Sequence, residues 1–421
     1  MRATFDLAVR WEAEALCEAP LRTGGADGDA EAVLRFPDGR AFIQGSSIAG
    51  ALRSWMKASS FAQEVEGLFG SQAGSGSLRI SDGVFDRDAE QAIRPRLHID
   101  GKTGTAEEGR KFDLAHMQTG SRFRFTVCRL GRENEREDDA LEAALAAMHR
   151  GEITLGGQKS NGFGRVSLRV RKRRFHLRDE ADREAWLEDA PGGEELKLPD
   201  GRNTAYVVFT AVGRTESLLV KASQPVDEGE NGSYTENIRE AGKPVIPGSS
   251  LKGGLRARAE LIAAYLGLDG SVIDGVFGAA ANTGDTGTSG RVVARDVLLG
   301  EHSRKITRIR INKLTGGVIR SGLFREEPVS SELTLNIKVE ASCPEGCALT
   351  LYALRDLGLG LWNLGSGASI GRGRITLDEV RAETPDRSLL NLRFDENGSC
   401  SLEDPAGLAE EWLNALKEGR E

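Results

Sequence analysis

The sequence repeats one series of motifs, and this internal repeat limits what the chain can fold into more than any other feature. Three landmarks occur twice in the same order: Gly45–Arg53 and Gly248–Arg256, Leu68–Gly70 and Val276–Gly278, and Leu155–Arg165 and Leu364–Arg374. The separations between the landmarks are nearly the same in both copies. Self-similarity of this kind indicates a duplicated structural unit. We therefore predict that the 421 residues form two copies of one domain.

Hydrophobic periodicity predicts the same order of elements in each copy. We expect an opening strand at 4–9 and 205–212, a helix capped by serine at 47–57 and 250–266, a second helix at 138–149 and 349–363, and a closing strand at 165–170 and 374–380. With short strands between the helices, this is the βαββαβ order of a ferredoxin-like domain. The predicted fold class is α+β, with two tandem ferredoxin-like (RRM-like) domains that carry long insertions.

The boundaries of the two copies divide the chain into four parts. We predict a first domain at 1–178, an acidic insertion and linker at 179–202, a second domain at 203–385, and a C-terminal tail at 386–421 with a short helix at about 405–417. The linker is polar and acidic, which suits a connection on the surface.

Composition argues against several classes of protein. No apolar run approaches the roughly 20 residues of a membrane span, and the N-terminus reads as a strand instead of a signal peptide. The five cysteines are scattered, and Cys343 and Cys347 lack the second pair or nearby histidine of a zinc site. We expect free thiols in a cytoplasmic protein.

Each copy carries an anion-binding pattern at its first helix. The Gly-Ser-Ser turn places backbone N–H groups and hydroxyl groups at a helix N-terminus, where the helix dipole attracts phosphate. Basic residues follow about one turn later. The candidate contacts are Gly45, Ser46, Ser47, Arg53 and Lys57 in the first copy, and Gly248, Ser249, Ser250, Lys252 and Arg256 in the second. Neither copy matches a P-loop or a dinucleotide fingerprint, which argues against a nucleotide-cofactor enzyme.

Charge is segregated along the chain, although the net charge is -8. Residues 156–178 contain eight lysines and arginines and no acidic residue, and residues 302–325 contain seven and none. Basic tracks on an acidic body favour binding to a phosphate backbone. Aromatic residues are only 6%, so stacking on bases would contribute little. Further candidate RNA contacts are Lys159, Arg165, Arg310, Lys313 and Arg372.

These motifs resemble the RAMP superfamily. The resemblance is carried by the string Ile246–Gly253, by a Phe-Gly before a Gly-rich loop, and by a terminal Gly-x-Gly-Arg. The first copy departs from this pattern, with Gln44, Ile48 and Ala49 in place of proline, leucine and lysine. RAMP proteins include the guide-RNA-binding backbone subunits of CRISPR–Cas type III effectors, and two fused copies resemble the tandem subunits of type III-D-like effectors.

The resemblance implies a palm with a protruding thumb hairpin in each copy, and it implies partners. The thumbs would lie at about 97–123 and 309–333, with His98 and Lys102 in the first. They would kink a duplex of guide RNA (crRNA) and target RNA at regular intervals. The implied partners are crRNA, target RNA and the other subunits of the effector.

The resemblance also implies a site that cuts target RNA. Some backbone subunits of the family use an aspartate in the loop after the first strand, together with a divalent cation such as Mg²⁺ or Mn²⁺. Val33-Leu34-Arg35 resembles the segment that follows this aspartate, but the ungapped position holds Ala30. The candidates are Asp29, which would also bind the metal, and Asp27, with Asp227 and Glu228 in the second copy.

Two alternatives to target cleavage stay open on the sequence. One is a scaffold that holds guide RNA and cuts nothing. The other is a nuclease that processes guide RNA, which would need a general base such as histidine. His98 is the histidine best placed for that role, although its position suits a thumb better.

Overall fold

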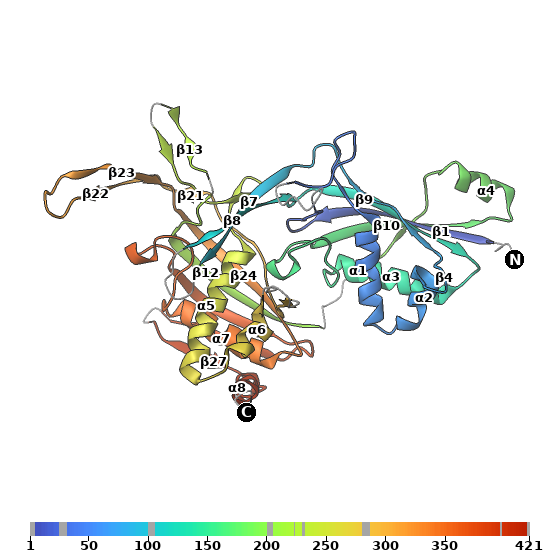
Figure 1. The fold of residues 1–421 in the computed structure, drawn as a ribbon. Coiled ribbons are helices and arrows are strands. Elements are labelled where there is room, and N and C mark those ends of the chain that lie inside the picture. Colours follow the sequence, from blue (N-terminus) through green and yellow to red (C-terminus); the bar gives the residue numbers. More distant parts are fainter. Residues whose placement is uncertain are drawn as a thin grey trace. The chain divides into compact units, whose positions relative to one another are not determined.

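The computed structural model describes residues 5–24, 32–99, 106–199, 205–222, 224–229, 232–279, 287–395 and 398–418. It divides into two compact units, coloured from blue to red along the chain in Figure 1. The first unit comprises Met1–Ile93, Asp113–Lys159 and Phe163–Asn203, and the second comprises Arg94–Phe112, Ser160–Gly162 and Thr204–Glu421.

The first unit is built on an antiparallel sheet with the strand order β11-β10-β1-β9-β6-β2, and β5 also pairs with β9. The strands are β1 Leu7–Cys17, β2 Phe42–Ile43, β5 Leu78–Ile80, β6 Gly83–Phe85, β9 Arg122–Gly131, β10 Val166–His176 and β11 Glu194–Leu196. The helices are α1 Gly45–Lys57, α2 Val65–Phe69, α3 Glu135–His149 and α4 Glu180–Leu187, and β3 Gly70–Ser71 pairs with β4 Gly74–Ser75.

A two-residue period decides which face of this sheet is buried. In β1 the side chains of Val9, Trp11 and Ala13 face the core, whereas Glu12 and Glu14 point to the opposite face. Helix α1 buries a stripe of Ile48, Leu52 and Met56, spaced by four residues. These residues belong to the hydrophobic core of the first unit.

The second unit repeats this plan, with the strand order β19-β24-β12-β25-β26-β27 and β21 paired with β24. The strands are β12 Tyr206–Leu218, β19 Val292–Ala294, β21 His302–Ser303, β24 Val329–Glu340, β25 Ile375–Glu383, β26 Leu389–Phe394 and β27 Cys400–Glu403. The helices are α5 Gly248–Leu266, α6 Gly270–Phe277, α7 Pro344–Gly358 and α8 Leu408–Glu418. Shorter strands are β13 Val226–Asp227, β14 Ser233–Tyr234, β15 Arg239–Glu240, β16 Lys243–Ile246, β17 Gly278–Ala279, β18 Thr288–Ser289 and β20 Val297–Leu298.

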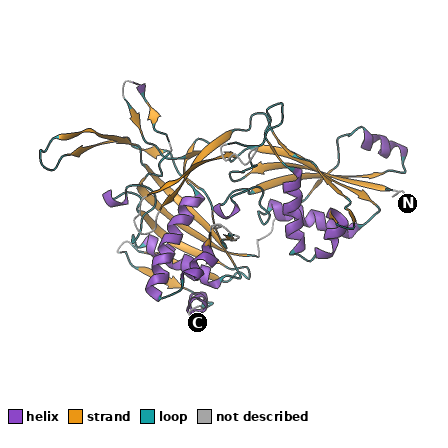
Figure 2. Ribbon diagram, in the orientation of Figure 1, coloured by secondary structure: helices purple, strands orange, loops and turns teal. Residues whose placement is uncertain are grey.

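Figure 2 distinguishes the purple helices from the orange sheet strands in each unit. The predicted α+β fold of two ferredoxin-like domains is confirmed, including a hairpin in each copy. The hairpins are β7 Gln91–Ile99 with β8 Ala106–Met117, and β22 Ile306–Ile311 with β23 Val318–Glu326. The predicted thumb ranges extended too far, because residues 122–131 and 329–340 are palm strands β9 and β24.

The segments predicted as linker and tail contain regular structure. Helix α4 and strand β11 lie in 179–202, and β11 pairs with β10 at the edge of the first sheet. Trp186 of α4 packs edge-on against Phe175 of β10, with ring centroids 5.3 Å apart, which fastens the segment to the sheet. In the tail, β26 and β27 extend the second sheet, and α8 lies close to the predicted helix.

The predicted helix starts need correction. Helices α1 and α5 begin at the glycine, and their N-cap residues are Gln44 and Pro247, so the serines lie inside the first turn. Helix α7 begins at Pro344, five residues before the predicted start of 349, because proline is well tolerated in the first turn. All five cysteines are free, as expected. No helix in the described ranges is long and apolar enough to cross a membrane.

The repeated segments Leu155–Arg165 and Leu364–Arg374, which we call the Gly-rich signature, are each closed by one glycine. Leu155 N–H donates to the carbonyl of Gly164 at 2.8 Å, and Leu364 N–H donates to that of Gly373 at 2.9 Å. Gly164 and Gly373 have φ of +82° and +72°, and a Cβ on either would overlap the carbonyl oxygen of the same leucine. The signature therefore requires glycine at these positions for both backbone conformation and space.

We expect Gly164→Ala and Gly373→Ala each to lower the free energy of unfolding by about 2–5 kcal/mol, from left-handed backbone strain and steric overlap. Gly120→Ala is the matched control, because Gly120 has φ of +91° but nothing within 4 Å of the added Cβ. It should cost only about 1–2 kcal/mol. Urea unfolding of the full chain measures all three variants, and equal losses would contradict the role of the close approach.

Candidate nucleic-acid interface

The first turn of each Gly-Ser-Ser helix is occupied by a carboxylate of the protein itself. Gly45 N–H donates to Asp82 at 2.7 Å, and Gly248 N–H donates to Asp296 at the same distance. The sequence predicted these amides as groups available to phosphate, and the aspartates take that position because an anion is stabilised there. Neither aspartate was predicted. They could have been predicted from the repeat, because an aspartate closely follows β5 in the first copy and β19 in the second.

Asp296 has a second partner within the second unit. Arg94, on β7, donates to Asp296 at 2.7 Å and to Glu240 at 2.7 Å, and its side chain is only 2% exposed. A buried arginine between two carboxylates is strongly held, because removing the arginine would leave the buried Glu240 and the nearly buried Asp296 without this partner. The strand β7 is thereby joined to the start of α5.

The basic residues of the two helices differ in their surroundings. Arg256 is compensated, because it bonds Asp274 at 2.7 Å, Glu260 at 2.9 Å and a backbone carbonyl. Arg53 lies near the carbonyl of Gly70, at 3.4 Å. Lys57 is exposed, as are Ser46 and Ser47, whereas Ser249 and Ser250 are half-buried.

Lys252 is buried, and among the described residues no carboxylate bonds to its ammonium group. Its side chain lies against Gly290, where an added Cβ would be 2.8 Å from Nζ. Burial, followed by the charge of Arg256, lowers the pKa of Lys252 to about 8. A cation held in this way is costly to the fold and well suited to an anionic ligand. The first copy has Ala49 at this position and lacks the feature.

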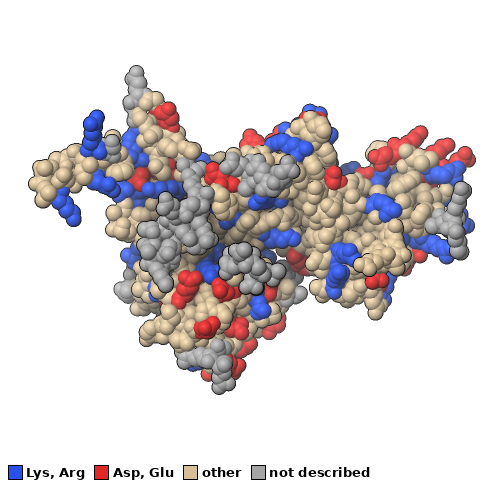
Figure 3. Space-filling model, viewed as in Figure 1, with Lys and Arg blue, Asp and Glu red and all other residues tan. Residues whose placement is uncertain are grey.

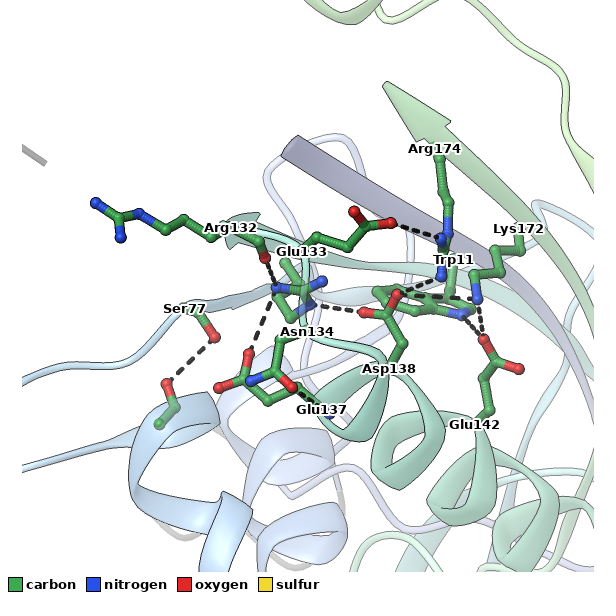
Figure 4. Close-up of polar contacts among 12 residues, drawn as sticks. Trp11, Ser77, Arg132, Glu133, Asn134, Glu137, Asp138, Glu142, Lys172 and Arg174 are labelled. Carbon is green, nitrogen blue, oxygen red and sulfur yellow. Dashed lines mark hydrogen bonds and ion pairs between the residues drawn. The ribbon is translucent and has the colours of Figure 1, made fainter. Parts of the chain in front are cut away.

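The basic block at 156–178 does not form one continuous track, because strand β10 alternates its side chains between two faces. Arg169 and Arg171 are exposed on the face away from the helices. On the other face, Arg174 bonds Asp138 at 2.9 Å and Lys172 pairs with Glu142. Figure 4 shows these acids reaching from α3 to the basic side chains.

The acidic residues of α3 also bond to residues of the sheet strands. Asp138 also accepts from the buried Arg129 at 2.7 Å, and Glu142 accepts from the indole N–H of Trp11 at 3.3 Å. These contacts hold α3 on the sheet and are not available to RNA.

Two of the predicted RNA contacts lie elsewhere in this block. Arg165 pairs with Glu18, and burial lowers the pKa of Lys159.

The basic block at 302–325 is different, because most of its charge has no carboxylate partner. It forms the hairpin β22–β23, from which Lys and Arg side chains project in Figure 3. In the described part of the chain, three exposed residues of the hairpin form no ion pair, and neither does the exposed Arg304 just before β22. The three are Arg310, Lys313 and Arg320. Arg310 lies over the ring of Phe324, with 5.6 Å between Cζ and the ring centroid.

The remaining cations of this block pair at the hairpin base. Arg308 pairs with Glu326, and Glu326 also accepts from Arg372 at 2.7 Å. Lys305 and Arg325 pair with Glu228. Arg372 is therefore bonded inside the protein, although the sequence predicted it as an RNA contact.

Several predicted residues lie outside the described part of the chain. These are Asp27, Asp29 and Lys102, together with the side chain of His98.

The second-copy candidates for catalysis are described, and they do not form a metal centre. Hydrogen bonding from Lys305, with a further bond from Arg325, lowers the pKa of Glu228. Asp227 accepts from the backbone N–H of Gly229 at 2.9 Å. No group of three or more His, Cys, Asp or Glu residues in the described ranges could hold a metal ion. Glu228 is thus compensated by two cations, which is a poor setting for a metal ligand.

The architecture is that of tandem ferredoxin-like domains, each with a Gly-rich signature and a hairpin. The family model of the RAMP superfamily matches residues 14–167 and 227–376, one match in each repeat, and the chain belongs to this superfamily. No curated protein matches the chain. Among 243 matching chains of solved structures is one from a cryo-EM structure of the type III-B Cmr-beta bound to cognate target RNA. The identity is 16%, the TM-score is 0.33, and the match covers 39% of this chain and 60% of that one.

The buried charge of Lys252 makes a pH-dependent prediction. Its pKa in the fold is about 8, below the ordinary 10.5. Between these two pH values, Lys252 binds more protons in the unfolded chain than in the folded one. The free energy of unfolding should therefore rise with pH from about 8 to 10.5. Below pH 8 the lysine is charged in both states, and its buried charge should destabilise the fold. We expect Lys252→Met to remove this rise and to stabilise the second unit at pH 7. Urea unfolding across pH 6–10.5 tests this, with the exposed Lys57→Met as control; the same pH dependence in both variants would contradict it.

Proposed function

We propose that this protein is a guide-RNA-binding backbone subunit of a type III CRISPR effector, with crRNA, target RNA and other effector subunits as its partners. The observation that carries the proposal is the hairpin β22–β23, in which the exposed Arg310, Lys313 and Arg320 have no carboxylate partner in the described chain. Membership of the RAMP superfamily supports it. A set of cations without acidic neighbours binds phosphates and releases their counterions, which favours association at low salt.

The hairpin also presents apolar side chains to its ligand. Leu314, in the turn of the hairpin, is 95% exposed, and Ile309 and Ile311 are about half exposed on β22. Apolar side chains at the end of a protruding element can insert between bases and kink a duplex. Cations along the strands and an apolar tip therefore suit a hairpin that crosses a guide–target duplex without reading its sequence.

RNA binding should depend on salt through the hairpin. We expect Arg310→Gln and Lys313→Gln each to lower the slope of log affinity against log salt by about 0.7, the value for one phosphate contact on a single strand. Arg381→Gln is the control, because Arg381 is an exposed arginine of β25 that already pairs with Glu383. Fluorescence anisotropy with a labelled single-stranded RNA measures the slope. Binding that does not respond to salt would contradict the proposal.

We further propose that the first copy carries any cleavage of target RNA, at Asp29 or Asp27. The second copy supports this assignment, because its Glu228 is paired with two cations and its Asp227 accepts a backbone N–H. These two residues do not fit a Mg²⁺ or Mn²⁺ centre, which needs several oxygen ligands. The compensation of Glu228 equally favours the second candidate function, a scaffold that holds guide RNA without cutting.

Cleavage by the assembled effector separates these two functions. With Mg²⁺ present, Asp29→Ala or Asp27→Ala should abolish regularly spaced cuts in target RNA, whereas Asp227→Ala and Glu228→Gln should leave them. Gel analysis of end-labelled target RNA reads out the cuts. Identical cuts in all four variants would assign cleavage to another subunit and support the scaffold.

A further inference from the structure

The base of the hairpin β22–β23 holds a cluster of three cations around one carboxylate. Glu326, at the end of β23, is 7% exposed at its side chain. It bonds Arg372 at 2.7 Å, Lys221 at 3.4 Å and Arg308. We refer to these four residues as the Glu326 cluster.

The three cations come from different parts of the second unit. Arg308 belongs to β22 of the hairpin itself, Lys221 follows β12 of the palm, and Arg372 lies in the Gly-rich signature. Glu326 therefore joins the hairpin to the palm and to the signature at one point. Buried pairs of this kind specify geometry more than they add stability.

The charges in the cluster do not balance. One carboxylate faces three cations, and the Nε–H of Arg308 is buried without a hydrogen-bond acceptor in the described structure. Lys221 and Arg308 are 48% and 37% exposed at their side chains, whereas Arg372 is 6% exposed. Two cations thus reach solvent beside one buried carboxylate, and an anion that binds there would balance their charge.

A second group of ion pairs lies at the base of the same hairpin. Lys305 and Arg325 share Glu228, and Lys305 also lies over the ring of Tyr234, with 4.2 Å between Nζ and the centroid. Glu236 and Glu327 also act electrostatically on this neighbouring group, so the excess of cations belongs to the Glu326 cluster itself. That excess favours a phosphate over a second carboxylate of the protein.

We propose that the Glu326 cluster is a phosphate site, at which Lys221 and Arg308 bind one phosphodiester of RNA and Arg372 acts through Glu326 as a positioning residue. The proposal rests on the proposed function and gives it a location, at the base of the second hairpin. Arg372 is too buried to reach the ligand itself. Its guanidinium fixes the carboxylate of Glu326, which in turn directs the guanidinium of Arg308.

The equivalent place in the first copy holds a different contact. The residue aligned with Arg372 is Phe163, which is buried and packs against His116 with ring centroids 5.6 Å apart. The signature thus meets the end of β8 through an aromatic contact in the first unit. At this position the first copy therefore has an aromatic ring where the second has the guanidinium of Arg372.

Four variants separate binding from positioning. Lys221→Gln and Arg308→Gln should each weaken binding of single-stranded RNA and lower the slope of log affinity against log salt by about 0.7. Arg372→Lys keeps the charge but loses the two-pronged guanidinium. It should weaken binding while leaving the slope unchanged, and hydrogen exchange in β22 and β23 should become faster. Arg393→Gln, at an exposed ion pair on β26, is the control and should change neither quantity.

Inorganic phosphate, followed by ³¹P NMR, distinguishes this site from the proposed function as a whole. Wild-type protein should bind phosphate, and Lys221→Gln should lose that signal, even if RNA binding fails. Unchanged salt slopes in both Lys221→Gln and Arg308→Gln, with normal RNA binding by the wild type, would overturn the site and leave the function standing. A wild type that binds neither RNA nor phosphate would overturn both.

Discussion

The approach of a helix to the sheet at a single glycine underlies both units. At Gly45 a Cβ would lie 2.6 Å from the carbonyl oxygen of Ile80, and at Gly248 it would overlap the carbonyl oxygen of Ala294. Only glycine permits backbone to lie this close to backbone. Asp82 after β5 and Asp296 after β19 then accept the N–H of these glycines. The glycine contact therefore fixes where the helix begins and how closely it approaches the sheet, and it places a negative charge at the helix N-terminus. The serines are consequently placed in the first turn and not at the cap.

The same contact changes what the helix N-terminus can offer a ligand. With Asp82 or Asp296 bonded to the first amide, the dipole of the helix is already partly compensated by the protein. Any affinity for phosphate must then come from side-chain cations. In the second unit the candidates are Lys252, the exposed cations of the hairpin β22–β23 and the Glu326 cluster. The first unit has Ala49 in place of the lysine, so the two copies are alike in fold and unequal in charge.

Much of the fold was predictable from local patterns. The duplication, the alternating strands and the Gly-rich signatures are encoded over short stretches, and the structure confirms the α+β order. Boundaries were less predictable. The serines suggested caps, but helix α1 starts at Gly45 because of a contact with a residue 37 positions away. The acidic stretch 179–202 suggested a linker, whereas its strand β11 pairs with β10 and its Trp186 packs on Phe175, so the stretch is fastened to the first sheet.

Sequence alone determined that the chain is two related domains with basic segments, because repeats and charge counts need no knowledge of contacts. Tertiary structure decided which of those charges are available, because the compensating acids lie far along the chain. Arg174 meets Asp138 across 36 positions, Arg372 meets Glu326 across 46, and Gly248 meets Asp296 across 48. An ion pair depends on distance in space, and a linear count of charge cannot report it. The repeat can therefore be predicted from the sequence. Packing determines how the two copies differ in the charges that remain unpaired.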